Sequence, residues 1–279
     1  MLSLRYLKIW VGGAILTLLV VCGLGAPLLA PRDPQAQTLE DRLRPPRWVE
    51  NGSPSYFLGT DNLGRDMLSR IIYGSRISLM VGAATVIFAG LLGCTLGAMA
   101  GYFGQSVDEI VSKVSEIFLA FPFLLIAIAI MAFLGQGVGN LIIALMLSRW
   151  VQYCRVVRGE VLSIKERDFI TAAKALGGQD FYVLFRHVVP NTFASVTVIA
   201  TFGMAIVIIT EASLSFLGLG VPVHIPTWGS MLAEGRSYIN RAPWLTIFPG
   251  LAIFITVFGI NLLGDGLRDV FDPKLRRQR

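Results

Sequence analysis

The chain has 279 residues, of which 54% are hydrophobic and only 15% are charged, with a formal net charge of +6. This is too much apolar surface and too little charge for a soluble globular protein of this size, so lipid must solvate much of it. The positive charge does not indicate nucleic acid binding, because the basic residues flank apolar runs in the manner of topology signals. Two histidines and three widely spaced cysteines predict neither a metal site nor a redox motif.

The first apolar run covers residues 9–30 and follows Arg5 and Lys8. A basic start before an apolar stretch is also typical of a cleaved secretory signal. This run is longer than the apolar part of such signals, and Pro31 directly follows Ala30, the only suitable small residue. We therefore predict a retained transmembrane helix.

The polar stretch at residues 31–76 contains five prolines, which exclude one long helix. We predict an extended loop outside the membrane. Near its end, four apolar residues recur at helical spacing: Met67, Leu68, Ile71 and Ile72. They indicate either a short amphipathic helix on the membrane face or a loop helix packed on its own domain.

Five further apolar runs follow, at residues 77–100, 117–134, 138–154, 193–219 and 244–263. Crossing a membrane takes about 20 apolar residues, so the sequence predicts an all-α polytopic membrane protein with six transmembrane helices. Arg149 interrupts the weakest run, where we expect its side chain to reach the headgroups from near a helix end. We divide the chain into residues 1–76, a helix and its periplasmic loop, and residues 77–279, a core of five helices.

The positive-inside rule gives the expected orientation. If both termini share a compartment, the segments on that side hold 15 of the 24 lysines and arginines. We therefore predict that both termini are cytoplasmic and that residues 155–192 form a cytoplasmic loop.

This cytoplasmic loop predicts two short helices joined at a glycine pair. An alanine-rich helix stops at Gly177 and Gly178, where positive φ costs little, and a second helix runs from Asp180 to Pro190. Two such helices form a compact protrusion with a slim face that can enter a groove of a partner. An ordinary loop between helices is an equally good interpretation of these residues alone.

The loop resembles the "EAA" loop of permease subunits of binding-protein-dependent ABC importers. The resemblance rests on Thr171-Ala-Ala-Lys-Ala-Leu-Gly177, followed at the expected distance by Pro190; threonine stands at 171 in place of the usual glutamate. In that family the loop forms a coupling helix that sits in a cleft of the ATPase subunit. The resemblance implies that the docking residues are Thr171, Ala172, Ala173, Gly177, Asp180, Phe181 and Pro190.

Three other stretches are similar to C-type subunits of the dipeptide, oligopeptide and nickel branch. They are residues 58–76, 226–232 and 248–268. The resemblance implies a type I importer permease in the bacterial inner membrane, which carries peptides together with a second permease subunit, two ATPase subunits and a periplasmic or lipid-anchored binding protein. Nickel chelates or another small solute are the alternative cargo.

No phosphate-binding G-x-x-x-x-G-K-[ST] loop and no nucleophile with a base occur in the sequence. We therefore expect no catalytic site and no cofactor in this chain, with ATP and magnesium on the partner subunits. An ion-coupled secondary transporter is a rival, but it would carry several intramembrane charges or a duplicated half. A membrane scaffold is another, but it would not need the protrusion.

Glu211 is the one acid well inside an apolar run. A carboxylate at membrane depth is costly and usually faces a bundle interior or a watery cavity. It can belong to the translocation path, where it would meet a peptide amine. A structural hydrogen bond to a neighbouring helix or to backbone is the interpretation that we favour.

Asp61, Arg65 and Asp66 lie in the external loop. Charges there are normally a solvated surface, although the family resemblance also suggests a docking or gating role. Trp228 and Trp244 flank the last apolar run, and we predict that they anchor the chain at the membrane interface.

Overall fold

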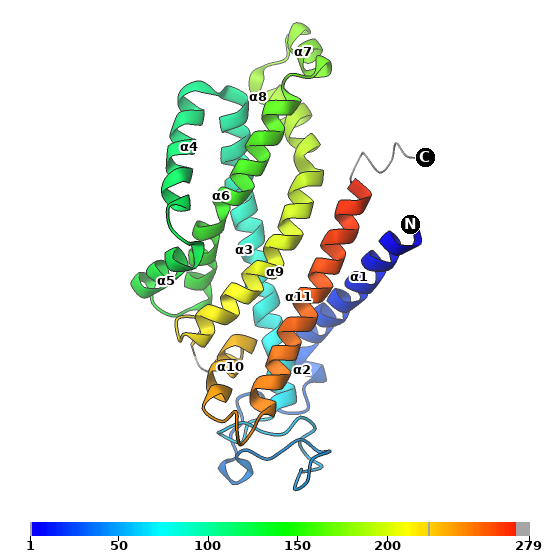
Figure 1. Cartoon of the computed structure of the whole chain (residues 1–279), viewed down its shortest axis with the longest axis vertical. Helices are drawn as coiled ribbons and strands as arrows, with labels where there is room; N and C mark the ends of the chain where they lie inside the picture. Colours follow the sequence, from blue (N-terminus) through cyan, green and yellow to red (C-terminus); the bar gives the residue numbers. More distant parts are fainter. Residues whose placement is uncertain (1, 223, 272–279) are drawn as a thin grey trace.

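The computed structural model describes residues 2–222 and 224–271, which form a bundle of long helices with a loop region at one end (Figure 1). The helices are α1 (Leu2–Leu24), α2 (Ala26–Leu29), α3 (Met67–Phe103), α4 (Gln105–Leu119), α5 (Phe123–Leu134), α6 (Val138–Ile164), α7 (Asp168–Ala175), α8 (Asp180–Val183), α9 (Phe193–Phe216), α10 (Trp228–Arg236) and α11 (Trp244–Phe271). Short turns of other helix types are η1 (Leu39–Asp41), η2 (Leu184–Val188) and η3 (Val189–Thr192). The predicted all-α class is confirmed.

The number of spans differs from the prediction. Four helical segments in the described part of the chain are long and apolar enough to cross a membrane: Tyr6–Leu24, Met67–Phe103, Asp180–Phe216 and Trp244–Phe271. A fifth is added if α4 and α5 count as one bent span. α6 is long enough, but polar residues such as Arg149 and Gln152 keep its hydropathy low. The prediction of six spans is therefore not confirmed.

The predicted span over residues 117–134 is not one helix. α4 ends at Leu119 and α5 starts at Phe123, and their axes differ by 86°. Pro122 between them has no amide hydrogen, and a proline disfavours helical conformation in the residue before it. The proline thus ends one helix and begins the next, which the hydropathy pattern does not reveal.

The loop helix predicted near Met67 is also wrong as a separate element. Met67 is the first residue of α3, a helix of 37 residues that continues through the predicted second span. The Asp66 carboxylate caps this helix by accepting the amide hydrogen of Ser69 at 2.8 Å. Met67 itself is buried beside Met231 and Leu245. The division at residue 76 therefore falls inside a helix, and as a domain boundary it stays a prediction.

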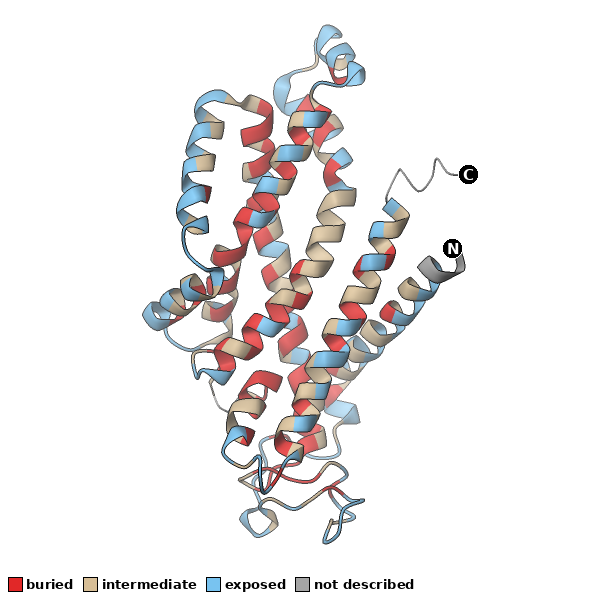
Figure 2. Cartoon of the chain, viewed as in Figure 1, coloured by how far each residue is buried: buried red, intermediate tan, exposed pale blue. Residues whose placement is uncertain are grey.

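The closest packing in the bundle is between α3 and α6, and three glycines at intervals of four residues permit it. A Cβ atom at Gly93 or Gly97 would lie 2.3 Å from a backbone oxygen of α6, and one at Gly101 would lie 2.9 Å from such an oxygen. Small residues at this spacing let helix backbones approach closely in membranes. Figure 2 shows that much of the buried surface lies on α3, α6 and α9.

The two ends of the described chain pair with each other. α1 packs along α11, and Lys8 lies 3.1 Å from Asp269. Figure 1 shows that α1 begins and α11 ends on the side of the bundle that carries α7, while residues 30–66 lie at the opposite end. Trp10 and Leu24 on α1 are each 75% exposed, as suits a helix surrounded by lipid.

Candidate functional site

The protrusion predicted from the glycine pair is present at one end of the bundle (Figure 1). α7 ends before Gly177, whose φ of 86° is the left-handed conformation that favours glycine. α8 then begins at Asp180. The prediction of two short helices joined at this glycine is confirmed.

The second helix of the protrusion does not end at Pro190 as predicted. α8 passes into the π-helical turn η2 and the 3-10 turn η3, and these lead directly into α9. Pro190 lies in the first turn of η3, where a missing amide hydrogen costs little. The change of helix type therefore carries the chain past the proline without a break.

The protrusion is attached to the end of α3 by polar and aromatic contacts. The Tyr102 hydroxyl donates to Oδ1 of Asp180 at 2.9 Å, and Nζ of Lys174 lies 3.2 Å from the same oxygen. The hydrogen bond to Asp180 raises the pKa of Lys174. The Phe103 and Phe181 rings lie 5.3 Å apart. These contacts join the tip to the bundle rather than leaving it as a free loop.

The tip of the protrusion exposes apolar side chains. Leu176 is 90% exposed, and three aromatic residues that follow it are more than half exposed: Phe181, Tyr182 and Phe185. Ala172 also points outward, whereas Ala173 is partly buried against the bundle. An exposed apolar cluster of this kind marks a surface that meets another protein or a membrane.

Asp61, Arg65 and Asp66 of the external loop are buried rather than solvated, so that expectation is wrong for these three residues. Nε of Arg65 lies 2.6 Å from Oδ2 of Asp61, and its Nη2 lies 2.7 Å from Glu234 on α10. Arg70 of α3 contacts both of these acids. The four side chains tie the loop to α3 and α10, while Asp66 serves as the helix cap. A docking or gating role for the loop stays a prediction.

Glu211 lies on α9 in the bundle interior and is 1% exposed. Its carboxylate accepts hydrogen bonds from Ser78 Oγ of α3 at 3.1 Å and from Ser215 Oγ at 2.9 Å. The structural hydrogen bonds favoured from the sequence are therefore present and connect two helices. A place in the translocation path stays a prediction.

Trp228 does not anchor the chain at a membrane interface as predicted, because it is 1% exposed and its indole donates to the carbonyl of Ile71 at 3.1 Å. Trp244 is half-buried and donates to the carbonyl of Thr60 at 3.0 Å, and its role as an interfacial anchor stays a prediction. Each indole therefore fastens a segment near the loop end to a distant part of the same chain.

Arg149 is not near a helix end, because α6 continues to Ile164, which is about 22 Å further along the axis at 1.5 Å per residue. Its guanidinium is instead buried, with 8% of the residue exposed. Nε and Nη2 have no hydrogen-bond partner among residues 2–222 and 224–271. The sequence signal was an arginine inside an apolar run, which we interpreted incorrectly.

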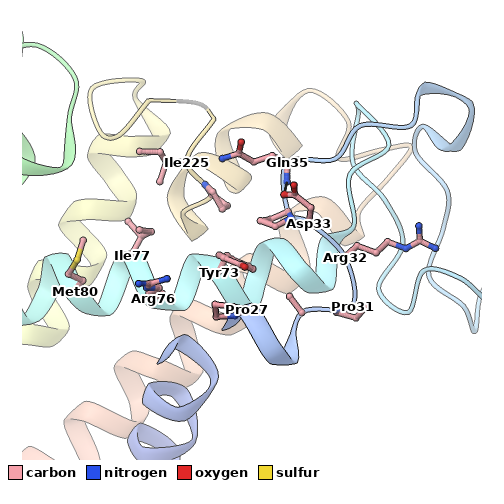
Figure 3. A pocket seen from close by; sticks show the side chains of 13 residues that line it. Pro27, Pro31, Arg32, Asp33, Gln35, Tyr73, Arg76, Ile77, Met80 and Ile225 are labelled. Atoms are coloured by element: carbon pink, nitrogen blue, oxygen red, sulfur yellow. Dashed lines mark hydrogen bonds between the residues drawn. The ribbon is translucent and has the colours of Figure 1, made fainter. Parts of the chain in front are cut away.

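A cavity of about 940 Å³ opens at the loop end between α2, α3 and the segment before α10 (Figure 3). Asp33 and Gln35 from the loop and Tyr73 and Arg76 from α3 line it, together with apolar residues such as Ile77. Sequence patterns did not indicate this cavity, because its walls come from parts of the chain that are far apart.

Comparisons with known proteins show what the whole chain is similar to. Residues 93–277 match the family of binding-protein-dependent transport system inner membrane components. The chain is 43% identical to a di/tripeptide transport system permease protein of Pseudomonas aeruginosa, over 95% of this chain and 88% of the relative. It is 42% identical to a glutathione transport system permease protein of Pectobacterium atrosepticum, over 95% and 86%. Identity to an oligopeptide transport system permease protein of Bacillus subtilis is 38%, over 96% and 86%.

Proposed function

Since the chain belongs to the family of binding-protein-dependent transport system inner membrane components, we propose that it is one permease subunit of an ATP-driven peptide importer. In this proposal it forms half of a translocation path, and a second permease subunit forms the other half. Peptides are the favoured cargo because relatives that match 95% or more of the chain are named as di/tripeptide and oligopeptide permeases.

The observation that carries the coupling role is the exposed apolar tip around Leu176. A short helix with a small outward residue, Ala172, can enter a cleft, and the aromatic residues behind it can line the rim of the contact. In the proposal, two cytoplasmic ATPase subunits each bind the tip of one protrusion. One of these protrusions belongs to this chain and the other to the second permease subunit. Those subunits bind ATP and magnesium, and this chain performs no bond chemistry.

The proposed orientation places the α7 end of the bundle in the cytoplasm. The start of α1 and the end of α11 lie at that end and are joined by Lys8 and Asp269, which supports a cytoplasmic location for both termini. The loop of residues 30–66 then faces the periplasm. A periplasmic or lipid-anchored binding protein would deliver its peptide there, near the cavity that Figure 3 shows.

In the proposal, the connections of the tip to the bundle helices transmit its motion to the translocation path. α7 joins the end of α6 to the turns that lead into α9, and the Tyr102 contact with Asp180 links it to α3. When the ATPase subunits close on ATP, they displace the tip and with it these helices. The path then opens alternately to the two sides of the membrane.

The test replaces Ala172 by arginine or Leu176 by aspartate in the complete transporter. Both residues are exposed, so the subunit should still fold and reach the membrane, whereas Ala173 is unsuitable because it packs on the bundle. Peptide uptake by proteoliposomes should fall by about tenfold or more, as expected when a central contact of an interface is lost. ATP hydrolysis should no longer respond to the loaded binding protein.

The matched control is Ser106→Arg, which adds the same bulk at an exposed position in the first turn of α4, on the same end of the bundle. It should leave uptake unchanged. If uptake survived the arginine at Ala172 and the aspartate at Leu176, the protrusion would not be the coupling element.

A further inference from the structure

Arg149 is a buried charged residue that has no part in the proposed docking of the protrusion. Its guanidinium carbon lies 5.2 Å from the centre of the Phe123 ring, and no acid in the described part of the chain pairs with it. A charge buried without a hydrogen-bonded counter-ion is costly, and a contact with an aromatic face offsets only part of that cost. Intramembrane charges of this kind mark substrate or ion pathways.

Arg158, on the same helix as Arg149, does pair with an acid. Nη2 of Arg158 lies 2.6 Å from Oδ2 of Asp108, and Nε also contacts this carboxylate. Arg149 lies nine residues earlier on α6, which is about 13 Å deeper into the bundle. Among the residues that the structure describes, an acid pairs with Arg158 near the end of the bundle and none pairs with Arg149 deeper within it.

The Arg149 side chain borders a cavity of about 550 Å³ between α6 and the bend from α4 to α5. Phe121 and Phe123 form an apolar wall, and Gln152 and Arg155 add polar groups on α6. Two arginines and no acid line this space, so its electrostatic potential favours an anion. A volume of this size suits a small molecule such as a short peptide.

The backbone at this cavity is unusual for membrane depth. The chain is not helical between α4 and α5, and this break, which contains Phe121 and Pro122, borders the cavity. Irregular backbone in the hydrocarbon region occurs where it is covered by protein or lines an aqueous cavity. Gln152 and Arg155 are also exposed on the same side of α6. This side is therefore suited to water and solute rather than to acyl chains.

We propose that Arg149 binds the C-terminal carboxylate of the peptide during its passage. The guanidinium fork matches a carboxylate with two parallel hydrogen bonds, and the rings of Phe121 and Phe123 form an apolar wall for the body of the peptide. The inference rests on the proposed function, because it assigns one contact within the peptide path. It also accounts for the bare guanidinium, which is satisfied only while cargo is present.

The experiment uses the complete transporter with Leu119→Cys as a reporter, since Leu119 lines the cavity and is 51% exposed. Maleimide labelling is measured without the binding protein, so that the peptide selectivity of the binding protein does not affect the measured protection. Trialanine should slow labelling, and trialanine amide, which lacks the carboxylate, should not. Arg149→Gln should weaken the protection by trialanine about tenfold or more, given the usual strength of hydrogen bonds to charged groups.

Two further variants keep the test decisive. Arg149→Lys retains the buried charge but loses the fork, so it assembles even if Arg149→Gln does not, and its protection should also weaken about tenfold. Lys113→Gln removes one positive charge from the exposed face of α4, away from the cavity, and should leave protection unchanged.

Equal protection by both peptides, or protection that survives loss of the fork, would overturn the assignment. A complete lack of protection with Arg149 in place would also overturn it. If Arg149→Gln then also released the second permease subunit from the complex, the acid that pairs with Arg149 would be a side chain of that subunit. Failure of the proposed function looks different, because the unmodified transporter would then take up no peptide even with its loaded binding protein.

Discussion

Replacing Gly97 by alanine tests whether backbone contact fixes the distance between α3 and α6. A Cβ atom there would lie 2.3 Å from the carbonyl oxygen of Cys154 and 3.0 Å from its carbonyl carbon and Cα. These atoms belong to the backbone of α6, so no change of rotamer can relieve the clash. The two helices must separate by at least about 0.7 Å, in an interior packed too densely to absorb the shift.

The expected cost follows from two opposing effects. Overpacking of a well-packed interior costs about 1–3 kcal/mol. Alanine is a better helix former than glycine, which returns about 0.5–1 kcal/mol. The net effect of Gly97→Ala should therefore be a loss of about 0–2.5 kcal/mol in the free energy of unfolding, and a loss of about 1–3 kcal/mol relative to an alanine substitution that meets no clash.

The assay is unfolding of the purified subunit in mixed micelles with increasing SDS fraction, followed by tryptophan fluorescence. The matched control is Gly90→Ala in the same helix, where the nearest atoms to a new Cβ are ring carbons of Tyr153 at 3.9 Å, an ordinary contact. Gly90→Ala should be neutral or slightly stabilising. If Gly97→Ala unfolded at the same SDS fraction as Gly90→Ala, the argument from backbone contact would be refuted.

Two other substitutions address the buried acids. Asp61→Asn removes one of two acids from the network that holds Arg70, and should destabilise the subunit by about 3 kcal/mol, because two buried arginines, Arg65 and Arg70, must then share the single carboxylate of Glu234. A melting temperature as high as that of the exposed control Asp33→Asn would contradict this. Glu211→Gln keeps an oxygen that accepts from Ser78, so uptake should stay within about twofold of the unmodified transporter. A normally assembled Glu211→Gln complex without uptake would favour a role in the path instead.

Apolar runs and four separated motifs carried most of what the sequence predicted. The family prediction is confirmed by the match over residues 93–277. The left-handed residue at Gly177 was predictable because only glycine adopts that conformation cheaply. These signals are local in the chain, so a single sequence is enough to read them.

The wrong predictions arose where local sequence signals compete, or where two residues in contact lie far apart in the sequence. Hydropathy averaged over residues 117–134 hid the break at Pro122, although the proline was visible in the sequence. Pro190 was given too much weight, because a π-helical and a 3-10 turn can accommodate it. The partner of Arg70, Glu234, lies 164 residues away, and no local pattern could have paired them.

The two connections of α7 to the bundle differ in stiffness, and this difference bears on how motion at the tip reaches the path. On one side the chain continues from α6, an unbroken helix whose backbone is in contact with α3 at Gly97. On the other side it passes through η2 and η3, whose hydrogen-bond geometry is poorer than that of an α-helix. A displaced tip should therefore carry α6 and α3 as one body and bend the chain at residues 184–192 before α9. Because Arg149 lies on α6, its cavity then moves relative to Glu211 on α9, which is the kind of change that alternating access requires.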